Sequence, residues 1–177
     1  LFALSGVLGQ YREARDCLKR FAGRGWDELE ALVLGPGWPG RTWSALRRCL
    51  DDEGLLRDES SPELSAVRDS IRRIHQRCTR KVKDFILSED LGGQLQDDFM
   101  TISSDRYVLP LKVGYKNRLK GVIHDYSQTG ETCYFEPMFL VEINNSLQEL
   151  KNREREEDRK VLAYLTGLAR NESDGVR

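Results

Sequence analysis

The sequence has little of the material from which metal and catalytic sites are built. Among its 177 residues there are only two histidines, and the four cysteines, Cys17, Cys49, Cys78 and Cys133, are far apart, with no C-x-x-C pair. Zinc ligands usually cluster in sequence, so no zinc site is expected, and the cysteines are interpreted as free thiols in a reducing cytosol. No G-x-x-x-x-G-K-[ST] phosphate loop is present, and no set of nucleophile, base and acid can be assembled. We therefore expect neither a catalytic site nor a bound cofactor or metal in this chain.

Long apolar runs and a strong net charge are also missing. No stretch is apolar enough to span a bilayer and no signal peptide is recognisable, so we expect a cytoplasmic protein with no membrane partner. The net charge is −1, so the chain as a whole is not attracted electrostatically to nucleic acid. Any contact with nucleic acid must therefore come from a local cluster of charge. The chain starts at Leu1 without methionine, and we expect it to be a piece of a longer protein.

Two long amphipathic segments dominate what is present. The first begins at Ser61-Pro62-Glu63, with serine as the cap, proline in the first helical position and an acid in the first turn. Its apolar positions alternate spacings of three and four, which is a heptad-like seam, and Gly92-Gly93 ends it. The second seam begins near Pro137 and runs to about Arg170. Three shorter helices are expected before them, at 1–22, 27–34 and 42–50.

Glu154 and Glu157 occupy seam positions in the middle of the second long segment. They mark either the place where an arm leaves the body of the protein and its packing partner changes, or a solvated gap in the seam. The sequence does not choose between these two interpretations.

Four strand-like segments lie between the long helices, at 100–103, 107–113, 119–126 and 132–135. Pro110 is expected at an edge or a bulge because it cannot donate to a ladder. Asn117-Arg118 is expected to form the turn of a hairpin between the second and third strands. The sequence thus predicts a mainly α fold with a small antiparallel β insert: a helical core portion at 1–60, long antiparallel helices at 61–98 and 138–171, and a four-stranded insert at 99–137, at the tip of the helical pair.

Five basic residues fall within fifteen positions that contain no acid: Arg106, Lys112, Lys116, Arg118 and Lys120. Three of them bracket the expected hairpin tip, beside Tyr115. Such a cluster suits binding of a phosphate backbone. Lysines are also placed on exposed strands to prevent edge pairing, so a merely solvated edge is the alternative. The many charges on the two long helices are interpreted as paired or solvated faces.

His124-Asp125 is a pair that suggests metal binding or acid–base chemistry. Neighbouring side chains on a strand point to opposite faces, so the two cannot easily converge on one substrate atom. A structural role beside the turn at 128–130 is therefore favoured over a hydrolase site.

Three runs carry a family resemblance: R-Y-V-L-P-L-K-V from Arg106, G-V-I-H-D-Y-S-Q-T-G-E-T-C-Y-F-E-P from Gly121, and E-I-N-N-S-L-Q-E-L from Glu142. They resemble the MutS family, and most closely the bacterial branch called MutS-two. The corresponding family patterns are R-Y-V-x-P-V-K, G-x-V-H-D-x-S-x-S-G-x-T-x-x-x-E-P and N-N-x-L-x-x-L. The match extends from 106 to 150 almost throughout, whereas residues 1–52 agree only in being helical.

The resemblance implies that the long helices are levers and that the β insert is a clamp. In that family a helical core joins the levers to a dimeric ATPase domain, which holds ATP and Mg²⁺, and a Smr nuclease domain is typical. The branch lacks the mismatch-reading domain of mismatch-repair MutS, and it is associated with suppressing recombination through branched DNA and with rescue of stalled, collided ribosomes. The partners implied are DNA, the ribosome, or both, and a second copy bound through the ATPase domain. A coiled-coil scaffold whose β tip binds a protein is the alternative, and this chain itself is expected to be no enzyme.

Overall fold

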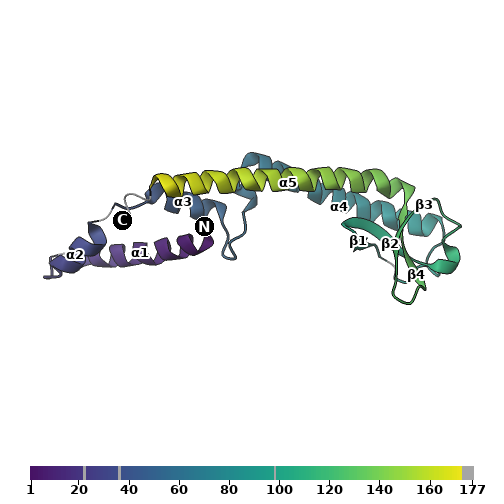
Figure 1. The fold of residues 1–177 in the computed structure, drawn as a ribbon, viewed down its shortest axis with the longest axis horizontal. Coiled ribbons are helices and arrows are strands. Elements are labelled where there is room, and N and C mark those ends of the chain that lie inside the picture. Colours follow the sequence, from purple (N-terminus) through teal and green to yellow (C-terminus); the bar gives the residue numbers. More distant parts are fainter. Residues whose placement is uncertain (22, 36, 98, 173–177) are drawn as a thin grey trace. The chain divides into compact units, whose positions relative to one another are not determined.

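The computed structural model describes residues 1–21, 23–35, 37–97 and 99–172. These residues form helices and one four-stranded antiparallel sheet (Figure 1), which confirms the predicted mainly α fold with a small β insert. The chain divides into two compact units. The first unit consists of Leu1–Ala66 and Glu154–Arg177, and the second unit is Val67–Arg153. The boundary on the last helix falls at Glu154, one of the two glutamates that interrupt the seam.

The first unit is helical. It contains α1 (Phe2–Arg20), α2 (Asp27–Leu34), α3 (Gly40–Cys49) and the end of α5 (Met138–Asn171). Its core joins Leu8 of α1, Trp43 and Leu46 of α3, and Val161 and Leu165 of α5. The three short helices therefore lie close to the positions that the sequence predicts, and an apolar core links α1 and α3 to the last helix.

The first long helix, α4 (Pro62–Ser88), begins where its cap signal predicts. The Ser61 hydroxyl oxygen accepts a hydrogen bond from the backbone N–H of Leu64 at 3.0 Å, which satisfies one of the free donors of the first turn.

No helix in the described ranges is long and apolar enough to cross a membrane.

The second unit packs one face of the sheet against α4 and α5 (Figure 1). Phe85 of α4 and Phe139 of α5 place their ring centroids 5.0 Å apart, so the two long helices are in contact within the second unit. The buried core of this unit draws on both helices, on the segment before the sheet and on two of its strands, β2 and β4. Its members are Cys78, Val82, Leu91, Leu95, Tyr107, Leu109, Leu111, Cys133, Phe135, Leu140, Ile143 and Leu147.

The sheet contains β1 (Thr101–Ser103), β2 (Arg106–Lys112), β3 (Gly121–Tyr126) and β4 (Thr132–Pro137), in the spatial order β1-β2-β4-β3. The expected hairpin between the second and third strands is therefore wrong, because β4 lies between them and pairs with both. Residues 113–120 do not turn back beside β2: they leave it opposite Thr132, at the start of β4, and reach β3 opposite Pro137, at the end of β4. The hairpins are β1–β2 and β3–β4.

Pro110 occupies an interior position of β2, opposite Tyr134 of β4. Its carbonyl accepts a hydrogen bond from the backbone N–H of Gln96 at 2.8 Å. Because the N and the C=O of one strand residue point to the same side, the missing donor faces this irregular segment and not the β4 ladder. The pairing of β1 with β2 has already ended at Val108.

Candidate nucleic-acid interface

The crossover between β2 and β3 carries most of the predicted phosphate-binding residues. We call residues 112–120 the basic loop. It starts at the last residue of β2, passes through a short 3-10 turn (Val113–Tyr115) and ends just before β3. Lys112, Lys116, Arg118 and Lys120 all lie on it, and no acidic residue interrupts them. The fold thus collects four cations on one continuous loop.

Two of these cations rest on tyrosine rings. The Lys116 ammonium lies 5.8 Å from the ring centroid of Tyr126, and the Arg118 guanidinium carbon lies 5.0 Å from that of Tyr115. Lys112 donates to the carbonyl of Gly93 at 3.0 Å. Lys120 is exposed. Aromatic contacts restrict flexible side chains without neutralising them, so the loop keeps its charge. That these residues bind nucleic acid stays a prediction.

Arg106 is the first residue of β2, whereas the basic loop starts at its last residue, Lys112. Its Nε donates to Oε2 of Glu136 at 2.9 Å and its Nη2 donates to Oε1 at 2.7 Å, a two-pronged ion pair. The same Nη2 reaches Asn145 Oδ1 at 3.0 Å. The guanidinium is therefore bound to other parts of the protein, and a role for Arg106 toward nucleic acid also stays a prediction.

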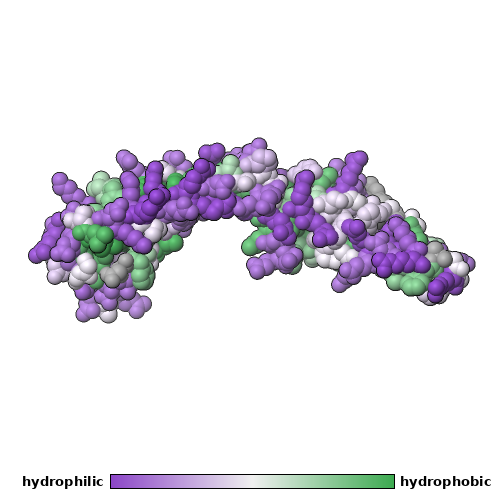
Figure 2. Space-filling view, turned by 180° about the vertical axis from the view of Figure 1, so that it is seen from behind, coloured by the Kyte–Doolittle hydropathy of each residue, from purple (hydrophilic) through white to green (hydrophobic). Residues whose placement is uncertain are grey.

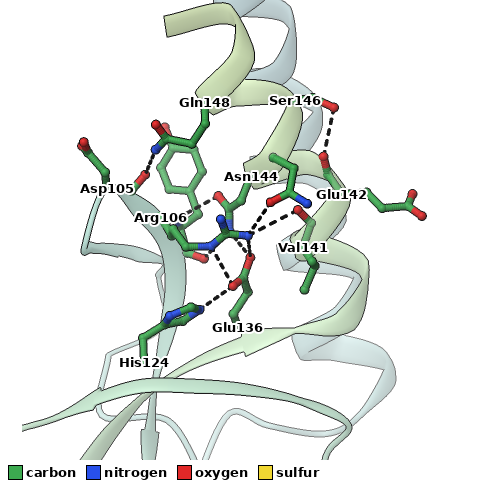
Figure 3. A network of polar contacts seen from close by, with 11 residues as sticks. Asp105, Arg106, His124, Glu136, Val141, Glu142, Asn144, Ser146 and Gln148 are labelled. Carbon is green, nitrogen blue, oxygen red and sulfur yellow. Dashed lines mark hydrogen bonds and ion pairs between the residues drawn. The ribbon is translucent and has the colours of Figure 1, made fainter. Parts of the chain in front are cut away.

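Glu136 is the centre of a polar network that joins the sheet to α5 (Figure 3). Its side chain is only 1% exposed. Besides Arg106, it accepts hydrogen bonds from Asn144 Nδ2 at 2.6 Å and from His124 Nε2. Both carboxylate oxygens are thus paired, which is the condition for burying a charge at tolerable cost.

Asn144 extends the network to the backbone of β2. Its Oδ1 accepts from the Tyr107 N–H at 2.9 Å, and its Nδ2 donates to the Tyr107 carbonyl at 3.0 Å. The Tyr107 hydroxyl in turn contacts His75 Nδ1 on α4. One strand residue is therefore held by both long helices of the second unit.

The β1–β2 turn is held against α5 as well. Ser104 and Asp105 have φ angles of 50° and 64°, a left-handed pair that suits a two-residue hairpin. Gln148 donates to the Asp105 carbonyl at 2.7 Å, and Lys151 pairs with the Asp105 carboxylate at 3.3 Å. Together with the network around Glu136, these contacts make the β insert and α5 a single packed body within the second unit.

Sequence reasoning missed this network although its members stand in the quoted motifs. Arg106, His124 and Glu136 come from the first two runs, and Asn144 and Asn145 from the third. The expected place of His124 is beside the turn at 128–130, but in the structure its Nε2 contacts the Glu136 carboxylate. A β-bulge between Ile123 and Asp125 turns its ring toward Glu136. The sequence does contain one signal for this network: Glu136 precedes Pro137 at the junction between the last strand and the second long helix. An acid that is buried at such a junction needs a basic partner.

Burial alone would raise the pKa of Glu136, but the hydrogen bonds from Arg106, Asn144 and His124 together outweigh it and hold that pKa below the ordinary 4.5. A group whose pKa is lowered by folding stabilises the fold above its unfolded pKa, and the contribution is lost as the pH falls through the folded value. We therefore expect the stability advantage of the parent over a Glu136→Gln variant to shrink as the pH is lowered from neutrality to below 4.5. Urea unfolding followed by tyrosine near-ultraviolet circular dichroism measures it, and an advantage that is constant over this range would contradict the assignment.

All four cysteines are free, and burial raises the pKa of the Cys78 thiol to about 11. Within the described part of the chain, no group of three or more His, Cys, Asp or Glu side chains is arranged to hold a metal ion.

Comparison with known proteins gives close relatives over nearly the whole chain. It is 59% identical over 174 residues to Endonuclease MutS2 of Maridesulfovibrio salexigens, which is 98% of this chain and 23% of that protein. It is 59% identical over 172 residues to Endonuclease MutS2 of Solidesulfovibrio magneticus, and 37% identical over 161 residues to that of Symbiobacterium thermophilum. These alignments cover 97% and 90% of this chain, but only 22% and 20% of the relatives. No protein-family model matches the chain.

Proposed function

Because the chain belongs to the MutS2 branch of the MutS family, we propose that it forms the lever and clamp portion of a nucleic-acid-binding ATPase of that branch. It spans about a quarter of the length of its relatives, so the proposal assigns it a mechanical and binding role within a larger molecule. Motion produced by ATP elsewhere in that molecule would move α4 and α5, and the β insert would close on DNA or on a ribosome.

The basic loop carries the proposal. Four cations on nine consecutive residues form a local positive site in a chain whose net charge is −1. Lysine and arginine side chains on a loop suit the phosphate backbone, and base edges are not needed for such contacts. Binding should be independent of sequence and sensitive to salt, with a dissociation constant roughly between 10⁻⁴ and 10⁻⁶ M for one clamp. Two clamps closed in a dimer would gain affinity by acting together.

The close attachment of the β insert to α5 also supports a mechanical role. A lever can move a binding loop only if the connection between them does not yield. The network around Glu136 and the contacts of Asp105 provide such a connection within the second unit. On this proposal the chain contributes binding and movement, and the chemistry named for its relatives belongs to other parts of the protein.

The test is a triple charge reversal, Lys116→Glu, Arg118→Glu and Lys120→Glu, in the full-length protein. We expect binding of branched DNA and of ribosomes to weaken by an order of magnitude or more, because three phosphate contacts become repulsive. Thermal stability should not fall, since these side chains lie outside the core. Fluorescence anisotropy at several salt concentrations measures the DNA arm, and co-sedimentation measures the ribosome arm.

A matched control reverses three cations elsewhere in the second unit: Arg73, Arg77 and Lys81 on α4, all of them exposed. A basic-loop variant that binds both partners as well as the parent does, at the same salt, would overturn the proposal. Loss of only one partner would identify which of DNA and ribosome the clamp holds.

A protein-binding tip is the second candidate, and exposed apolar side chains favour it. Leu87 at the end of α4 is 79% exposed, Phe99 is 65% exposed and Ile102 of β1 is 61% exposed. Figure 2 shows hydrophobic residues on the surface beside largely hydrophilic helices. Binding through such residues would survive high salt, whereas phosphate contacts would not.

A further inference from the structure

Tyr126 stands out on the surface beside the basic loop. It is the last residue of β3, the edge strand next to β4, and it is 45% exposed. Its backbone pairs with Cys133. The Lys116 ammonium lies over its ring, and among the described residues the Tyr126 hydroxyl group has no hydrogen-bond partner. A large aromatic ring is thus exposed to solvent next to a cation.

The neighbouring pair, Tyr115 and Arg118, is arranged differently. Tyr115 is partly buried and packs against the core of the second unit, and its ring supports the Arg118 guanidinium. Both rings contact a cation, but Tyr115 is packed against the core, whereas Tyr126 also exposes ring surface to solvent. Together they give the loop two cations, Lys116 and Arg118, beside one exposed ring.

This combination fits a single strand better than a duplex. In a duplex the bases are stacked on one another and only phosphates and groove edges are accessible. Proteins that bind single strands place basic side chains along the backbone and stack unpaired bases on aromatic rings. In an intact duplex the face of the Tyr126 ring finds no unpaired base to stack on.

We propose that Tyr126 stacks an unpaired nucleobase while Lys116 and Arg118 bind the adjacent phosphates, so that the clamp prefers single-stranded nucleic acid over continuous duplex. This inference rests on the proposed nucleic-acid function and specifies its substrate. Unpaired bases occur in branched DNA and in RNA, and the shared ligand is a base with its flanking phosphates.

The neighbouring acids are compatible with this arrangement. Asp125 lies opposite Tyr134 in the sheet, whereas Tyr126 lies opposite Cys133, so successive side chains project from opposite faces. The Asp125 carboxylate also accepts the Tyr126 backbone N–H at 2.8 Å. Glu131 lies in the β3–β4 turn and is exposed. The phosphates would accordingly lie on the Lys116 side of the ring.

The experiment compares Tyr126→Leu with Tyr126→Phe in the full-length protein. The probes are a short oligothymidylate, a short oligouridylate and a duplex of random sequence, at one low salt concentration. We expect Tyr126→Leu to weaken binding of the single strands by about tenfold, the effect of losing one base–aromatic stack, and to leave duplex binding unchanged. Tyr126→Phe, which keeps the ring, should bind as the parent does. The two single-strand arms show whether DNA or RNA is preferred.

A direct readout of stacking uses an oligonucleotide that contains 2-aminopurine, whose fluorescence changes when the base stacks. The change should occur with the parent and with Tyr126→Phe and be absent with Tyr126→Leu. Equal loss of duplex and single-strand binding in Tyr126→Leu would overturn the stacking proposal while leaving phosphate binding by the basic loop intact. A parent that binds none of the probes, by contrast, would overturn the proposed function itself.

Discussion

Replacement of Glu136 by alanine is expected to lower the free energy of unfolding of the second unit by about 3–5 kcal/mol, the usual cost of removing one partner from a buried ion pair. The variant leaves the Arg106 guanidinium, only 20% exposed, without its carboxylate, and Asn144 and His124 lose an acceptor. The loss should therefore exceed that of a simple cavity. Hydrogen exchange of the β2 and β4 backbone amides measures it directly.

The chain offers two controls for this experiment. Glu149→Ala removes an exposed carboxylate from α5, the helix that carries Asn144, and should change stability little. The three tryptophans, Trp26, Trp38 and Trp43, all lie in the first unit, so their fluorescence reports on that unit separately. A Glu136→Ala variant whose β4 amides exchange as slowly as those of the parent would show that the network contributes no stability.

Replacement of Gly121 by alanine is expected to cost about 3 kcal/mol, toward the upper end of the range for adding a methyl group to a packed site. A Cβ at this position would meet two ring carbons of Phe135 at 2.5 and 2.6 Å and would come still closer to the carbonyl oxygen of Glu136. Strand propensity alone favours alanine over glycine only weakly and predicts no such loss. The destabilisation would come from displacement of the backbone of β4, one residue before α5 begins.

Gly114 provides the matched substitution, because a Cβ there meets nothing within 4 Å. Gly114→Ala should be neutral or slightly stabilising, since it restricts the unfolded chain without a clash. Thermal unfolding of both variants, followed by tyrosine near-ultraviolet circular dichroism, tests the pair; four of the six tyrosines lie in the second unit. Equal melting temperatures for the two variants would contradict the packing argument.

The local elements follow from the sequence because their causes are local. Ser61-Pro62 marks the start of α4, and the structure has the expected hydrogen bond to the Leu64 N–H. The apolar spacing of three and four predicts both long helices, and α2 has the expected bounds, Asp27–Leu34. Helix caps and periodic apolar faces involve residues a few positions apart, so one segment contains the whole signal.

The order of the strands was decided by tertiary structure. Residues 107–113 and 119–126 are neighbours along the chain and look like a hairpin, yet β4 lies between them. Cys133 and Phe135 of β4 are almost fully buried, whereas Val122 and Tyr126 of β3 are more than 40% exposed. The central place therefore belongs to the strand that buries its side chains against the helices, and the eight residues of the crossover allow it. The alternation of apolar and polar residues within a strand indicates which residues share a face of the sheet. It does not indicate which other strand pairs with that strand.

The candidate site was likewise predictable only where its features are local in sequence. That four cations follow one another without an acid can be read from the residues alone, since charge is a property of the side chain. The pairing of Arg106 with Glu136, thirty positions away, follows from the tertiary structure, as does the place of the basic loop beside the exposed ring of Tyr126. A buried charge needs a partner close to it in space. The separation of two residues along the chain does not give the distance between them in the folded protein, so this pairing could not be predicted from the sequence.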